Sequence, residues 1–158
     1  MEKPLFLDRL PIKLNVEIIE YRQGGVIPQK VWRKKNVVVN VGREQIGLML
    51  ATGISNQITE IAWGDGGHDV GDPSQYTPAS LTDTALVNEI FRKAITSVTA
   101  PSQTSVRFTG LLESSDIVGQ GISEMGLFHD AGEMFARLAF PLIYKGPVPL
   151  EFRWTIEI

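Results

Sequence analysis

The sequence contains no cysteine, which excludes disulfide bonds, thiolate metal ligands and a thiol nucleophile. It has only two histidines, His68 and His129, and neither stands in a His-x-x-x-His pattern. No apolar run approaches the roughly 18 residues that span a membrane, and no basic-then-apolar signal peptide opens the chain. We therefore expect a soluble protein, made in a cytoplasm, that uses no cofactor and contacts no membrane.

Charge is modest in amount and uneven in distribution. The 158 residues carry a net charge of −3, and their number fits one domain. Within 1–45, nine basic side chains stand against five acidic ones, a balance of +4, whereas the remainder holds six against thirteen, or −7. The two parts are expected to face different surroundings, although a solvated basic strand would give the same balance.

Hydrophobic alternation predicts a hairpin near the N-terminus. Residues 12, 14, 16 and 18 are apolar and the positions between them are polar, which is typical of a half-buried strand. Gly24-Gly25 offers a turn, and 31–39 returns as a second run rich in β-branched residues. We therefore expect a hairpin over 12–39, preceded by an extended arm, 1–11, that contains two prolines.

One stretch, 41–52, predicts a helix. Ile46, Met49 and Leu50 have the spacing of one buried stripe. Asn40 is expected to cap the start of this helix, and Gly53 is expected to end it in the left-handed conformation.

The remainder of the chain, 58–158, predicts strands separated by turns. A long surface loop interrupts them over 68–82, and the strictest alternation falls in 150–158. The expected fold is mainly β, an antiparallel β-sandwich or barrel with one short α-helix and an extended N-terminal arm and hairpin. We expect 12–158 to form a single domain.

The glycine-rich segment after residue 63 gathers side chains that could bind a cation. Asp65, His68, Asp69 and Asp72 lie close together, but position 12 of a calcium loop counted from Asp65 is Tyr76 and not glutamate. We interpret them as turn formers and leave a weak divalent site open. Phosphate-loop and Gly-x-Ser-x-Gly patterns do not occur. We therefore expect no catalytic, cofactor-binding or metal residues, and a structural or binding protein.

One basic cluster surrounds a tryptophan. Such a cluster could bind phosphate or stack on a base. A β-edge whose lysines discourage unwanted strand pairing is the better interpretation for a net acidic protein, and contact with an acidic partner stays open. We expect no nucleic acid partner. The cluster comprises Lys30, Trp32, Arg33, Lys34 and Lys35.

Four motifs, read in order, resemble a known family. They are IAWGDGG at 61–67, TALVNEIFR at 84–92, ISEMGLFHDAG at 122–132 continuing to Phe135 and Ala136, and PLIYK at 141–145. Their order and spacing resemble the N-terminal domain of bacteriophage tail-collar and tail-fibre proteins, over about 37–158. The resemblance implies a virion protein that anchors a fibre to the baseplate or tail.

The same motifs suggest structural roles for particular residues. Glycines 64, 66 and 67 permit a tight turn beside Asp65, Gly126 suggests a bulge or a close backbone approach, and Asp130 to Gly132 form a hairpin turn. Glu89 and Glu124 stand among apolar neighbours, so we expect each to form a structural ion pair. The candidate partners are Arg92, Arg137 and Lys145, and the glycines are Gly64, Gly66, Gly67, Gly126 and Gly132.

Three functions are considered. The first is a non-enzymatic collar, baseplate or fibre-attachment component of a tailed phage, which the resemblance implies to be a trimer. The second is a capsid decoration protein, and the third is a small carbohydrate-binding or hydrolytic tail module. The sequence ends at Ile158, where family members continue into a shaft and tip, so we expect an anchoring module without direct host recognition.

The first two functions share a docking mechanism. An extended N-terminal strand would add to the sheet edge of a partner, with main-chain hydrogen bonds giving affinity and alternate side chains giving specificity. The basic cluster would face acidic surfaces of other virion proteins. The expected apolar anchors are Leu5, Phe6, Leu7, Leu10 and Ile12.

Overall fold

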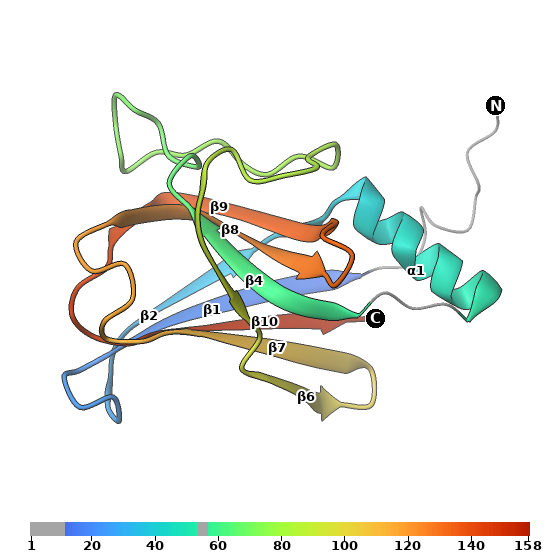
Figure 1. The fold of residues 1–158 in the computed structure, drawn as a ribbon, viewed down its shortest axis with the longest axis horizontal. Coiled ribbons are helices and arrows are strands. Elements are labelled where there is room, and N and C mark those ends of the chain that lie inside the picture. Colours follow the sequence, from blue (N-terminus) through green and yellow to red (C-terminus); the bar gives the residue numbers. More distant parts are fainter. Residues whose placement is uncertain (1–11, 54–56) are drawn as a thin grey trace.

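A computed structural model describes residues 12–53 and 57–158 and arranges them as a β-sandwich (Figure 1). The first sheet has the order β2 (Pro28–Lys35), β1 (Lys13–Tyr21), β10 (Leu150–Glu157), β7 (Ser105–Leu112) and β6 (Ser97–Ser102). The second sheet has the order β3 (Val37–Val38), β9 (Met134–Tyr144), β8 (Gly121–His129), β4 (Ile58–Gly64) and β5 (Glu89–Ala94). All neighbouring strands are antiparallel, and each sheet ends in two edge strands. The mainly β fold is therefore confirmed, as a sandwich and not as a closed barrel.

The N-terminal hairpin forms one side of the first sheet. β1 pairs with β2 and also with β10, where Val16 lies opposite Trp154 and both are fully buried. Apolar and polar residues alternate along β1 and β10, so the apolar side chains of both strands lie between the two sheets. The hairpin ends earlier than predicted, at Lys35, because Asn36 carries the chain across to the second sheet as β3. The predicted arm, 1–11, lies outside the described residues.

Helix α1 (Asn40–Thr52) occupies the position predicted for it and differs at its start. The N-cap residue is Val39, which makes no side-chain capping bond, so the expected Asn40 cap is wrong. Gly53 ends the helix as predicted, with φ 70°, and its N–H donates to the carbonyl of Met49. Within 12–53 and 57–158, no helix has the length and apolar character needed to cross a membrane.

The buried stripe predicted for α1 is also wrong. Met49 and Leu50 are 43% and 65% exposed, and the buried residue of this helix is Gly42. A Cβ on Gly42 would lie 2.2 Å from the carbonyl oxygen of Phe135, so the first turn approaches the backbone of β9 too closely for any side chain. The helix therefore meets the sandwich at its first turn and leaves much of its apolar face uncovered.

A long loop, 65–88, connects β4 to β5 and lies over the second sheet (Figure 1). It is longer than the predicted 68–82. Backbone hydrogen bonds tie it down, because Leu142 N–H donates to the carbonyl of Pro73 and Asn40 N–H donates to that of Leu81. Beneath the sheet, Trp63 packs across the sandwich on Phe152, with ring centroids 5.3 Å apart. The loop therefore covers the face of the second sheet that points away from the core between the sheets.

Candidate functional site

The most concentrated polar site of the described residues centres on the carboxylate of Glu124 in β8. Glu124 is fully buried, and its oxygens accept backbone N–H groups from Gly66 at 3.2 Å, Val87 at 3.0 Å and Asn88 at 2.8 Å. Gly66 is the second residue of the 65–88 loop, whereas Val87 and Asn88 are its last two. One carboxylate therefore holds both ends of the loop on the sheet.

Arg137 of β9 balances this buried charge. Its Nε and Nη2 donate to Glu124 Oε2 at 3.1 and 2.7 Å, and its Nη1 donates to Asp83 Oδ2 at 2.7 Å. Burial lowers the pKa of Arg137, but its bonds to Glu124 and Asp83 outweigh burial and leave that pKa above its ordinary value. Because Asp83 lies five residues before the end of the loop, the arginine fixes a third point of the loop to the sheet.

Ser123 adds a second anchor beside the glutamate. Its fully buried hydroxyl accepts the backbone N–H of Gly67 at 2.9 Å and of His68 at 3.1 Å, and it lies 2.9 Å from His68 Nδ1. A serine hydroxyl beside an imidazole resembles the nucleophile and base of a hydrolase. Here the hydroxyl is buried under the loop that it binds, so a substrate would reach it only if the loop opened.

The glycines of the 61–67 motif permit this close packing. A Cβ on Gly67 would lie 2.1 Å from the Ser123 carbonyl oxygen, and one on Gly66 would lie 2.6 Å from the Val87 side chain. Gly64 faces Glu124 in the same way, with its Cβ position 2.6 Å from the carboxylate. These glycines are needed because neighbouring backbone or side-chain atoms occupy the space of a Cβ, and not because φ is positive as in a tight turn.

Two acidic residues of the loop accept hydrogen bonds from other residues of the loop. Asp65 accepts a hydrogen bond from the Asn88 amide at 2.5 Å, and exposed Asp72 accepts one from the Ser74 hydroxyl, which lowers the pKa of Asp72. Among the described residues, no group of three histidine or acidic side chains is arranged to hold a metal ion. Asp72 therefore forms a local turn with Ser74, whereas Asp65 joins the start of the loop to its end.

The other glutamate singled out by the sequence lies at the edge of the second sheet. Glu89 pairs with Arg92 at 2.6 Å, and Arg92 also bonds Glu60 at 3.1 Å. The pKa of Arg92 is raised, chiefly by its hydrogen bond to Glu89. Lys145 is paired with neither expected glutamate; it is buried, donates to the Gly146 carbonyl at 2.8 Å, and has a pKa lowered by burial.

Two glycines singled out by the sequence lie in β8 and in the turn that follows it. Gly126 is a site of close approach, since its Cβ would lie 3.2 Å from the Ala136 carbonyl oxygen, and the register shifts of β8 fall on either side of it. The turn after β8 contains Asp130 and is closed by Gly132, which has φ 92° and donates its N–H to the His129 carbonyl at 2.9 Å. Both glycines serve the packing or reversal of β8 and β9.

The basic cluster lies on β2, an edge strand, and is divided between two faces. Trp32 lies opposite Ile18 and packs against the core, so Lys30 and Lys34 share its inward face and line a cleft beside the end of β9. Lys34 Nζ lies 6.0 Å from the Tyr76 ring centroid. Arg33 points outward, 76% exposed, and pairs with Glu17 at 3.4 Å. The side chain of Lys35 lies outside what the structure describes, and the described side chains of the cluster form two small surfaces and not one basic patch.

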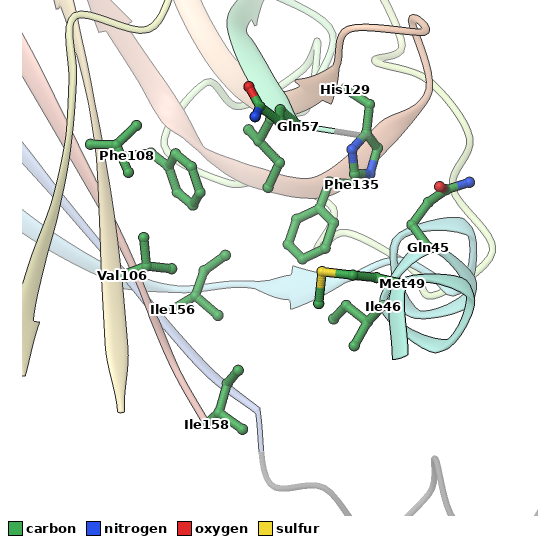
Figure 2. A pocket seen from close by; sticks show the side chains of 12 residues that line it. Gln45, Ile46, Met49, Gln57, Val106, Phe108, His129, Phe135, Ile156 and Ile158 are labelled. Carbon is green, nitrogen blue, oxygen red and sulfur yellow. The ribbon is translucent and has the colours of Figure 1, made fainter. Parts of the chain in front are cut away.

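An apolar groove opens at the end of the sandwich where α1 stands (Figure 2). It has a volume of about 500 Å³ and was not predicted, because the helix residues that line it were expected to be buried. His129 and Phe135 meet edge to face in its wall, with ring centroids 5.6 Å apart. Its lining comes from α1 (Gln45, Ile46, Met49), from β6 and β7 (Val98, Val106, Phe108), from the β8 and β9 ends (His129, Phe135) and from Gln57, Ile58, Ile156 and Ile158.

Comparison with models of protein families matches residues 34–151 to one family, described as "phage tail-collar fibre protein, N-terminal". Comparisons with curated proteins and with solved structures gave no match. The matched range contains Glu124, Arg137 and the whole 65–88 loop, and it begins at the end of β2. It covers most of the chain. The chain therefore belongs to the phage tail-collar fibre protein N-terminal family and has a structural role in a phage tail.

Proposed function

We propose that this chain is a non-enzymatic anchoring module at the collar, baseplate or fibre-attachment point of a phage tail, and that it assembles as a trimer docked on neighbouring virion proteins. The observation that carries this proposal is that the buried charged side chains hold the 65–88 loop on the sheet. Arg137 binds both Glu124 and Asp83, and Glu124 also binds the loop backbone, so these three side chains stabilise the loop and sheet as one unit. A rigid platform of this kind suits a part that transmits load between other proteins.

The absence of an enzymatic role is supported by the surroundings of the one pair that resembles a catalytic site. Ser123 is buried and already accepts two backbone N–H groups. A catalytic serine needs an approach for substrate and donors facing the developing oxyanion. Since the N–H groups of Gly67 and His68 point at the serine itself, they are engaged in holding the loop.

Docking would use the two edges of the first sheet, which differ in chemistry. β2 carries cations, whereas β6 is exposed along its whole length and bears no charged side chain. Charged edges resist strand addition and uncharged edges permit it, which on β6 applies to the part before Pro101. We infer that β6 provides contacts between copies, and that Lys30, Arg33 and Lys34 on β2 face acidic surfaces of other virion proteins.

The N-terminal arm would provide the remaining contact. Leu5, Phe6, Leu7 and Leu10 lie outside the described residues, and Ile12 packs against the core immediately before β1. An arm attached at the end of a strand can add to the sheet edge of a neighbour, as in donor-strand complexes.

Deleting residues 1–11 is expected to leave a folded domain that no longer enters particles, because β1 begins at Lys13 and keeps all its partners. The measurement is the amount of the truncated chain in purified phage particles, with its thermal unfolding recorded in parallel. Val26→Ser in the exposed β1–β2 turn serves as a control and should be incorporated normally. Full occupancy by the truncated chain would show that the arm does not dock.

A further inference from the structure

The groove at the end of the sandwich is lined mainly by apolar side chains, several of them exposed. Met49 on α1, Val98 on β6 and Ile158 after β10 line it and are 43%, 56% and 62% exposed. Figure 2 shows Ile46, Met49, Phe135 and Ile156 around the same open space. Contiguous apolar surface with few polar groups commonly marks a place where another segment or protein binds.

The first described residue lies at the mouth of this groove. β1 pairs with β10 so that Leu14 faces Ile156, and the pairing continues one residue earlier from Lys13 to Glu157. By the same register Ile12 is level with Ile158, which lines the groove, and Ile12 packs against the core. Residues 1–11 are therefore joined to the domain at the rim of the groove.

The sequence of that segment has the composition that the groove requires. Pro4, Leu5, Phe6 and Leu7 form an apolar stretch, followed by the polar pair Asp8-Arg9, where a turn is chemically suitable. From Ile12, an extended chain reaches about 16–18 Å to Leu7 and about 23–25 Å to Leu5. Since a short tether gives an effective concentration on the order of millimolar, the chain's own segment outcompetes a second copy at micromolar concentration.

We propose that the groove binds the N-terminal segment of the same chain, with Leu5, Phe6 and Leu7 packed against the exposed apolar side chains of α1, β6 and β10. The occupied groove completes the end of the hydrophobic core in the free protein. An arm that docks on a neighbour must first leave this groove, so assembly includes an exchange of one apolar contact for another. The proposal concerns the isolated chain and stands whether or not the arm binds a virion partner.

Cysteine pairs in the full chain test the proposal cleanly, because the natural sequence has no cysteine. Leu7→Cys is combined in turn with Ile46→Cys, Met49→Cys and Val98→Cys, and each variant is oxidised at low micromolar concentration. The expected result is the loss of both free thiols in at least one pair, with the product still a single chain by mass and by non-reducing electrophoresis. Several positions are used because a disulfide forms only over a narrow range of geometry.

Leu7→Cys with Val26→Cys is the matched control. Val26 is exposed in the turn at the other end of β1, and nine strand residues at about 3.3 Å each separate the two ends by about 30 Å. Leu7 cannot reach that turn within one chain, so this variant is expected to keep its thiols as a monomer. If the groove variants form disulfide-linked dimers and the control does not, a second copy occupies the groove and the proposal is wrong. Free thiols in all three groove variants would also overturn it.

A second measurement does not depend on disulfide geometry. The full-length variant Leu5→Asp, Phe6→Asp, Leu7→Asp should release the segment, because three carboxylates cannot be buried against apolar walls. We expect a gain in fluorescence of an apolar dye over the wild-type chain at equal concentration. Equal fluorescence, with both proteins folded by circular dichroism, would show that the segment does not cover the groove.

Discussion

Replacing Glu124 by glutamine is expected to lower the free energy of unfolding by about 3–5 kcal/mol, the usual cost of leaving one member of a buried ion pair without its partner. Both carboxylate oxygens now accept N–H groups: Oε1 from Gly66 and Asn88, and Oε2 from Val87 and Arg137. In either orientation, the glutamine NH₂ would face donors that need an acceptor. The substitution therefore keeps the shape of the side chain and removes both its charge and half of its bonding.

Thermal and denaturant unfolding measure this effect. For a domain of this size, the expected loss corresponds to a fall in Tm of about 6–20 °C. Glu113→Gln is the matched control, because Glu113 also pairs with a cation, Lys93, but its side chain is 64% exposed. An exposed pair contributes about 0–1 kcal/mol. An unchanged melting temperature for Glu124→Gln would contradict a structural role for the buried pair.

Gly67→Ala is expected to detach the start of the loop from the sheet. Its Cβ would lie 2.1 Å from the carbonyl oxygen of Ser123 and 2.8 Å from the carbonyl carbon, which are backbone atoms of a central strand and cannot move aside. Overpacking of this kind costs about 1–3 kcal/mol, and separation would also weaken the bond from Gly67 N–H to the serine hydroxyl. We expect lower stability and faster proteolysis within 65–88.

Gly71→Ala provides the control within the same loop. Nothing lies within 4 Å of its Cβ position and its φ is not in the left-handed region, so alanine fits without strain. At such a position alanine stabilises by about 0.4–1 kcal/mol, because it restricts the unfolded chain. Equal stability and equal proteolysis of the two alanine variants would show that close packing at Gly67 is not what holds the loop.

The strand pattern could be predicted from the sequence because alternation reports directly on which face is buried. β1 and β10 obey it along most of their length, as Val16 and Trp154 show. The predicted 31–39 strand instead divides at Asn36 between two sheets, and nothing in its β-branched composition marks that crossing. The α1 stripe was wrong for a related reason: helical spacing identifies an apolar face but not whether another element covers it.

The polar site was predictable in part. Because Glu124 stands among apolar neighbours, a cationic partner was expected for it, and Arg137 was one of three candidates. Only the register of β8 against β9 shows which candidate lies beside the glutamate. Ser123 and Asp83 gave no signal, since a single serine in a strand or an aspartate in a loop is ordinary and their roles depend on residues far away in sequence. The basic cluster is divided because the Trp32 side chain points inward on β2, and Lys30 and Lys34, two positions before and after it, lie on the same face.

Locating the protein on the phage particle tests the central claim most directly. Electron microscopy of particles that carry a tagged copy of the full chain would show its position and its number. A tail anchoring module is expected at the collar, baseplate or fibre-attachment point, in few copies grouped around the tail axis. Density spread over the head in hundreds of copies would contradict this account and identify a capsid decoration protein instead.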